Sequence, residues 1–196
     1  MNIRAKMYNR RAQGEKSKPN ELIEGLDLKK GQSIADIGSG GGYFSFHFAQ
    51  AVGKSGKVFA VDVNRSALNY IRKESISMGL SNLQAIAAAD FFSKVPTGSL
   101  DIVFLRNVYH HLDDPAKYFA EMKLYLKPDG EVVIIDYRAD GRGFSFHKLF
   151  KHSVTPKEVA DDMIAAGYVS ERSFDFLPEQ YFMVFKSAKG DCCVRQ

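Results

Sequence analysis

Short apolar runs alternate with helical patterns of ten or more residues along most of this chain. Strands connected in this way form right-handed βαβ units, so that neighbouring strands run parallel in one sheet. The pattern therefore predicts an α/β fold with a Rossmann-like, doubly wound sheet. The expected strands are 33–37, 56–63, 82–90, 99–107 and 131–137, and the expected helices between them are 43–52, 65–78 and 115–126.

The C-terminal part is predicted to add a helix and a hairpin. Thr155 is followed three residues later by Glu158, which fits a capping box and predicts a helix over 155–168. The segments SERSFDFL and QYFMVFK indicate a closing β-hairpin. The segment KPDG, at 127–130, is expected to form a turn before the fifth strand.

The chain of 196 residues is long enough to bury one full hydrophobic core. We expect a single domain over 19–187, starting with a short helix at Pro19, and a C-terminal tail over 188–196. Residues 1–18 are polar and basic, with Glu15 as their only acid. This N-terminal arm is open to two interpretations, a solvated arm or a lid that orders over a ligand.

Composition limits the classes of function. The net charge of +4 is too weak by itself to indicate a nucleic-acid-binding protein. No apolar run is long enough to cross a bilayer. The only cysteines, Cys192 and Cys193, are adjacent in the tail, which excludes a disulfide framework and predicts a cytoplasmic location.

The stretch SIADIGSGGGYFSFHFAQ, at 33–50, places four glycines in five residues between a predicted strand and a predicted helix. Glycine is favoured where the backbone takes a positive φ or approaches another group closely. The helix that follows offers unpaired N–H groups and a partial positive charge. The stretch predicts a nucleotide-type binding turn, and a tight βα turn that binds nothing is the alternative.

The turn departs from the dinucleotide fingerprint G-x-G-x-x-G. Gly38 and Gly40 fit this pattern, but Tyr43 stands where the third glycine is expected. Asp36 precedes the first glycine by two residues, and Asp62 closes the next strand, where an acid would meet the hydroxyls of a ribose. Acids also stand at two further predicted strand ends, and ligands of such sheets bind beyond these ends.

Six motifs in order along the chain resemble the class I S-adenosylmethionine-dependent methyltransferases. The likeness is greatest to the small-molecule branch that includes the quinone-biosynthesis and arsenite methyltransferases. The motifs are ADIGSGGGYFS, VFAVDVN, AAADFF, DIVFLRNVYHHLDDP, LKPDGEVVIIDY and TPKEVADDMIAAGY…YFMVFK. The resemblance implies a seven-stranded sheet, mostly parallel, with an antiparallel last strand. It also implies S-adenosylmethionine as the cofactor and S-adenosylhomocysteine as its product.

The resemblance further implies a role for each matching residue. Asp36 and the glycine-turn backbone would face the methionine part of the cofactor. Asp62 would accept both ribose hydroxyls, Asp90 would bind the adenine amine, and Arg106 would lie near the sulfonium. The implied cofactor-binding residues are Asp36, Gly38, Ser39, Gly40, Gly42, Tyr43, Asp62, Val63, Asp90, Phe91, Arg106 and Asn107. Charge favours this interpretation, because a carboxylate suits a cationic ligand and a pair of vicinal hydroxyls. The alternative for Asp62 and Asp90 is capping of the turn that follows each strand.

Methyl transfer from a sulfonium depends on alignment and on the exclusion of water, and it also uses a base when the acceptor must lose a proton. His110 and His111 are the candidate bases. The alternatives for them are packing under the sheet end and metal ligation, and we predict no metal site. A second group could line an acceptor site or simply pack in the core: Tyr137, Phe144, Phe146, His147 and His152.

We therefore hypothesise a methyltransferase that acts on a small molecule. The rivals are a nicotinamide-dependent oxidoreductase, a binding module without catalysis, and an RNA methyltransferase that uses the basic arm. Arsenite is disfavoured because the cysteines lie only in the tail. DNA adenine is disfavoured because Asn107-Val-Tyr-His replaces the asparagine–proline–proline–aromatic signature of that class. The sequence leaves the acceptor and the oligomeric state open.

Overall fold

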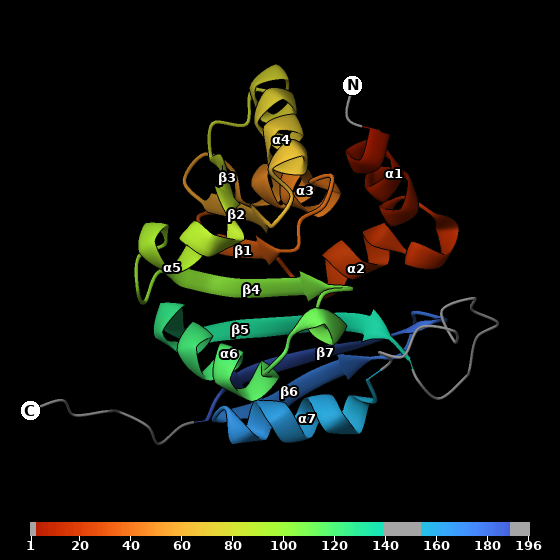
Figure 1. Ribbon diagram of the computed structural model, residues 1–196, viewed down its shortest axis with the longest axis vertical. Coiled ribbons are helices and arrows are strands. Elements are labelled where there is room, and N and C mark those ends of the chain that lie inside the picture. The colour runs from red at the N-terminus through yellow and green to blue at the C-terminus, as the bar shows by residue number, and fades with distance from the viewer. Residues whose placement is uncertain (1–2, 139–153, 189–196) are drawn as a thin grey trace, which may run out of the picture.

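A computed structural model of the chain describes residues 3–138 and 154–188. Its centre is a seven-stranded sheet in the order β3-β2-β1-β4-β5-β7-β6 (Figure 1). The strands are β1 (Ser33–Ile37), β2 (Lys57–Asp62), β3 (Leu83–Ala87), β4 (Leu100–Arg106), β5 (Leu126–Tyr137), β6 (Tyr168–Phe174) and β7 (Gln180–Ser187). The helices are α1 (Ile3–Ala12), α2 (Pro19–Gly25), α3 (Tyr43–Val52), α4 (Arg65–Ser77), α5 (Phe91–Lys94), α6 (Pro115–Met122) and α7 (Pro156–Ala165).

The strand directions confirm the predicted fold class. β1 to β5 pair in parallel, and β7 runs antiparallel to both β5 and β6. The β6–β7 pair is the hairpin expected from the C-terminal sequence. It places β7 beside β5, with Gln180 opposite Tyr137. The last strand therefore starts at the edge of the sheet where the parallel strands end.

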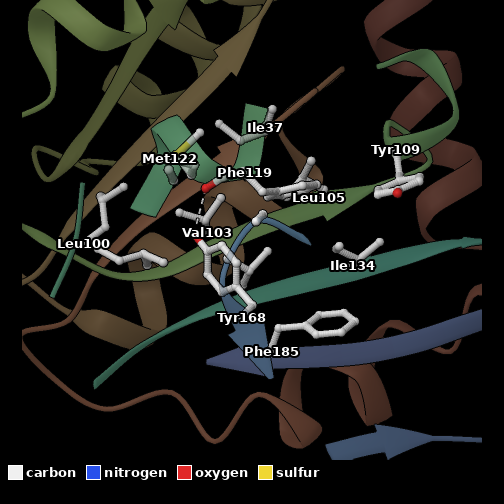
Figure 2. Close-up of a cluster of buried hydrophobic side chains, with 14 of the residues drawn as sticks. Ile37, Leu100, Val103, Leu105, Tyr109, Phe119, Met122, Ile134, Tyr168 and Phe185 are labelled. Carbon is white, nitrogen blue, oxygen red and sulfur yellow. Dashed lines mark hydrogen bonds between the residues drawn. The ribbon is translucent and has the colours of Figure 1, made fainter. Parts of the chain in front are cut away.

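Helices cover both faces of the sheet, as a doubly wound fold requires. On one face, α6 and α7 pack Phe119, Met122 and Met163 into the main apolar cluster. Figure 2 shows part of this cluster, in which the Tyr168 hydroxyl donates a hydrogen bond to the carbonyl oxygen of Phe119 at 3.0 Å. On the other face, α2 and α3 contribute a second cluster with Phe48 at its centre. The two clusters hold the strand ends in fixed positions.

Several predicted boundaries differ in the structure; the helix predicted over 115–126, for example, ends at Met122 and is followed by a 3-10 turn over Lys123–Tyr125. The KPDG segment lies inside β5 instead of forming a turn, and the pairing of β4 with β5 shifts its register between Leu100 and Ile102 to admit it. β3 ends at Ala87, because residues 88–90 form a 3-10 turn that leads into α5. The C-terminal helix stops at Ala165. Its capping box between Thr155 and Glu158 is present as predicted.

The N-terminal segment is helical and packed in the structure. Ala5 of α1 is fully buried, and α1 lies against the start of α3 near the strand ends (Figure 1). Most of the other side chains of α1 are exposed, and the interpretation of a solvated arm stays a prediction. Movement of this helix as a lid stays a prediction. Within the described ranges, no helix is long and apolar enough to cross a membrane.

Candidate active site

A cavity of about 1110 Å³ opens at the carboxyl ends of β1, β2, β4 and β5. Its walls combine the glycine turn, the β4 end with the 3-10 turn that follows it, and the start of β7. Helix α1 closes one side with Tyr8, Asn9 and Arg11. The cavity therefore lies where ligands of a doubly wound sheet bind.

The glycine turn, residues 38–42, is shaped largely by contacts inside the protein. A Cβ atom on Gly38 would lie 2.2 Å from Val108, and one on Gly42 would lie 2.7 Å from Ile71. A Cβ atom on Gly41 would lie 2.1 Å from the Asn9 side chain of α1. Gly40 has positive φ and lines the cavity. Close packing against other segments thus explains three of the four glycines, and Gly38 and Gly41 among them also line the cavity.

Asp36 is a buried acid directly below the glycine turn. It is 3% exposed and accepts a hydrogen bond from the Ser45 hydroxyl, one turn into α3. Burial raises the pKa of Asp36 to about 7, and the nearby charge of Asp62 acts in the same direction. This carboxyl group changes charge near neutral pH and lines the cavity. Ser45 was not among the residues expected at the site.

Asp62 connects the β2 end to the glycine turn. One carboxylate oxygen accepts the Gly40 N–H at 2.8 Å, and the other accepts the Asn64 N–H at 2.7 Å. Asn64 in turn caps α4. The expected turn capping is therefore present, and Asp62 also lines the cavity beside the exposed Val63. Each carboxylate oxygen has a further lone pair that can accept from a ligand.

Arg106 and Asn107 stand at the end of β4 and share a partner in Gln180 of β7. Arg106 Nη2 donates to Gln180 Oε1 at 2.7 Å, and Gln180 Nε2 donates to Asn107 Oδ1. Asn107 has a φ of 56° and is fixed by its N–H bond to the Ile135 carbonyl oxygen at 2.8 Å. Burial lowers the pKa of Arg106 to about 10, so the group stays a cation at neutral pH.

His110 and Asp136 form a hydrogen-bonded pair at the ends of β4 and β5. His110 Nδ1 lies 2.9 Å from both oxygens of the buried Asp136 carboxylate, which also accepts the backbone N–H of Tyr137. This carboxylate raises the pKa of His110 above its ordinary value, although burial opposes the shift. The His111 ring lies beside it with centroids 4.0 Å apart, and both rings line the cavity.

Comparison with known proteins identifies the family. The model of a methyltransferase domain family matches residues 28–173. The chain belongs to this methyltransferase family. The match confirms the resemblance drawn from the six sequence motifs, and it covers β1 to β5 and all but the last residue of β6.

This chain is similar to curated methyltransferases that differ in length. It is 31% identical to phosphoethanolamine N-methyltransferase 1 of Zea mays over 118 residues, which is 60% of this chain and 23% of that protein. It is 28% identical to the ubiquinone/menaquinone biosynthesis C-methyltransferase UbiE of Cupriavidus metallidurans over 170 residues, which is 83% of this chain and 68% of that protein. The chain thus spans only about a quarter of the length of the first of these relatives.

Solved structures with the same fold support the architecture. A SAM-dependent methyltransferase from Aquifex aeolicus superposes with a TM-score of 0.73 at 22% identity and covers 91% of this chain and 96% of that one. A putative type 11 methyltransferase from Sulfolobus solfataricus gives a TM-score of 0.66 at 24% identity, over 90% and 93% of the two chains. At these identities the likeness shows the fold.

The methyltransferase domain does not bring every predicted residue to the cavity. Asp90 pairs with Lys94 at 2.9 Å on the surface, and Phe91 is buried in the core, so neither lines the cavity. The 3-10 turn after β3 redirects them, and Ala88 takes their place in the wall. Gly42 also packs away from the cavity. The cofactor roles of these three residues stay predictions.

Several other residues of the site were missed or lie outside the described part of the chain. Asn9 accepts the Tyr43 N–H at 3.2 Å, and neither Asn9 nor Gln180 carries a local sequence signal. Asp136 does carry one, its position at a strand end. Tyr137 lines the cavity as one of the proposed wall residues. The remaining wall residues and both cysteines lie outside the described residues: Phe144, Phe146, His147, His152, Cys192 and Cys193.

Proposed function

We propose that this chain is an S-adenosylmethionine-dependent methyltransferase that acts on a small molecule. The observation that carries the proposal is a single cavity that joins the acidic ends of β1 and β2 to the His110–Asp136 pair. Membership of the methyltransferase family supports the same activity. The bound cofactor would supply a methyl group on a positively charged sulfur.

The first half of the cavity lies at the ends of β1 and β2, and its residues fit this cofactor. Asp36 and Asp62 provide negative charge for a ligand that carries an ammonium and a sulfonium group. Asp62 also has the acceptor geometry for two neighbouring hydroxyls. The cavity volume of about 1110 Å³ is slightly above the roughly 300–1,000 Å³ that small-molecule sites occupy, which leaves room for an acceptor beside the cofactor.

The second half of the cavity lies at the ends of β4, β5 and β7, and it holds a candidate base. With Nδ1 directed at the Asp136 carboxylate, a neutral His110 carries its proton there and leaves Nε2 to accept one. The carboxylate also stabilises the imidazolium that this transfer forms. His110 would therefore remove a proton from an acceptor atom.

Two further predictions accompany this proposal. The acceptor is a small molecule, which the UbiE relative supports because its name describes methylation of carbon in quinone biosynthesis. A cytoplasmic location also stays a prediction. A binding module without catalysis would have the same first half of the cavity, so turnover is the observation that separates it from an enzyme.

Calorimetry with the purified chain tests the proposal. We expect saturable, micromolar binding of both S-adenosylmethionine and S-adenosylhomocysteine, and no binding of NADH. Binding of NADH alone would support the oxidoreductase instead. Absence of binding by any of the three would contradict the assignment of the cavity. With cofactor binding established, radiolabelled methyl transfer to a panel of small acceptors separates the enzyme from the binding module.

A further inference from the structure

Arg106 is a mostly buried cation whose charge has no anionic partner among the described residues. Its Nη2 donates to the neutral Gln180 side chain at 2.7 Å and to the Ser17 carbonyl oxygen at 3.3 Å. Its Nε and Nη1 are shielded from solvent and have no acceptor within the described chain. The guanidinium carbon lies 5.0 Å from the centre of the Phe44 ring. Burying a charge in this way is costly unless an opposite charge pairs with it.

The fold holds this cation in place at the cavity wall. Gln180 binds both Arg106 and Asn107, and the aromatic ring of Phe44 covers one side of the guanidinium. Tyr43 and Tyr137 are the ionisable groups that act on Arg106, and both are neutral phenols at neutral pH, since a phenol ordinarily has a pKa near 10 and burial raises the pKa of these two further. The arrangement is therefore a fixed positive charge in neutral, partly apolar surroundings.

Charge is divided along the cavity. Asp36 and Asp62 lie at the β1 and β2 ends, and Arg106 lies at the β4 end. Lys16, another cation of the wall, already pairs with Glu179 at 2.6 Å. Arg11 of the wall is exposed, so that water and salt screen its charge. Arg106 is thus the cation of the wall best placed to attract an anion out of water.

We propose that Arg106 binds an anionic oxygen group, a carboxylate or a phosphate, of the methyl acceptor. This inference rests on the proposed function and names the class of its substrate. Arg106 is the last residue of β4, His110 lies in the 3-10 turn that follows, and both line the cavity, so an acceptor with its anion at Arg106 would have its reacting atom toward His110. A guanidinium suits this task because its planar set of donors matches carboxylate and phosphate oxygens.

The test uses arginine resonances of the full chain. Protein labelled with ¹⁵N-arginine and saturated with S-adenosylhomocysteine is titrated with benzoate, with phenyl phosphate and with the neutral isostere benzamide. We expect at least one of the two anions, and not benzamide, to shift the Nε–H resonance that disappears in Arg106→Lys. Benzoate alone would assign a carboxylate, and phenyl phosphate alone would assign a phosphate. No shift with either anion would overturn the proposal.

Matched variants locate the effect. Arg106→Gln should weaken anion binding about tenfold or more, while Arg106→Lys keeps the charge and should lose less. Lys157→Gln removes one positive charge from an exposed site on α7 and should change nothing. An unchanged anion affinity in Arg106→Gln, with the thermal midpoint retained, would overturn the proposal.

The cofactor also carries a carboxylate, and the same variants separate the two ligands. The family resemblance implies a cofactor role for Arg106, which this proposal replaces, so we expect Arg106→Gln to bind S-adenosylhomocysteine within about twofold of the original chain. A loss of cofactor affinity equal to the loss of benzoate affinity would assign Arg106 to the cofactor and overturn the proposal. If the original chain binds no S-adenosylhomocysteine, the proposed function fails, and the anion titration of the unliganded chain still decides whether Arg106 binds anions.

Discussion

The two halves of the cavity differ in how the chain builds them. The half at β1 and β2 is acidic and comes mainly from consecutive residues, from Asp36 through the glycine turn, together with the next strand end. The half at β4, β5 and β7 contains a cation and a histidine, and its pairs join residues far apart in the sequence, 26 residues for His110 with Asp136 and 74 for Arg106 with Gln180.

This difference matches the division of labour in the proposed enzyme. A cofactor shared by a whole family can be held by one short, recognisable stretch of sequence. Acceptors vary from enzyme to enzyme, and the half that would bind them is assembled from several segments that change independently. If the comparison is correct, substitutions in the first half change cofactor affinity, and substitutions in the second half change turnover.

The largest expected effect is on turnover in the second half. His110→Gln should lower turnover about 100- to 10,000-fold, because it removes the group that accepts the proton. Cofactor affinity should stay unchanged. Steady-state kinetics with an acceptor found by screening measure turnover, and calorimetry measures cofactor affinity. Equal turnover in this variant would remove His110 as the base, and His111→Ala then tests the neighbouring ring in the same assay.

The pH dependence of turnover adds a check on His110. Because the Asp136 carboxylate raises the pKa of His110 above 6.5, turnover should rise with pH through a pKa higher than that of a free histidine. Asp136→Asn keeps the shape of the side chain and removes its charge, so it should move this pKa to lower pH. A profile that does not move would show that another group controls turnover.

Asp62→Ala should give the next largest effect, on the first half. We expect a loss of cofactor affinity of about 3 kcal/mol, or roughly 100-fold, because a charged acceptor for two hydroxyls is removed. Asp62→Asn keeps an acceptor for the Gly40 or Asn64 N–H and separates loss of charge from distortion of the turn. Calorimetric titration with S-adenosylhomocysteine measures both. Unchanged affinity would mean that the motif register is wrong.

A smaller effect should appear in the pH dependence of cofactor binding. Since the pKa of Asp36 is about 7, affinity for the cationic cofactor should increase with pH between about 6 and 8, by up to roughly tenfold per pH unit below the pKa. Asp36→Asn should abolish this dependence. Titrations across the pH range would reveal it, and a wild-type affinity independent of pH would contradict the raised pKa.

Asp36 should also affect the stability of the fold, which should fall as the pH rises, whereas cofactor affinity should increase. Its folded-state pKa lies above the ordinary value of 3.8, so the folded state binds more protons between pH 4 and 7, and the free energy of unfolding falls as pH rises through this window. Asp36→Asn should therefore unfold at higher denaturant concentration than the original chain at pH 8. The difference should be a few kcal/mol, since each unit of pKa shift corresponds to about 1.4 kcal/mol.

The smallest expected effect distinguishes packing from ligand contact in the glycine turn. Gly41→Ala should destabilise the fold by about 1–3 kcal/mol, because the new Cβ atom would meet Asn9 and the Ala5 carbonyl oxygen of α1. The double variant Gly41→Ala with Asn9→Gly removes one of these two contacts and should recover part of the loss. Denaturant unfolding measures both variants. A normal stability with weaker cofactor binding would instead show that Gly41 serves the ligand.

The sequence by itself determined the sheet, the strand ends that carry acids and the capping box of α7. These features depend on apolar periodicity and on contacts within a few residues, which the local sequence encodes. It also placed Asp36, Asp62 and His110 at the edge of the sheet where the cavity opens. The KPDG segment was misjudged: it continues β5 as an irregularity between Leu126 and Glu131, the two residues that pair with β4 on either side of it.

Only the tertiary structure decided which side chains meet. Strand order and register bring Gln180 to Arg106 and place Asp136 under His110, and no local signal reports such pairs. The path of the chain after β3 turns Asp90 toward Lys94 on the surface. Helix α1, expected as an arm, fits against Gly41 because that residue has no side chain. Contacts of this kind depend on distances between elements, and these distances are fixed only when the whole core packs.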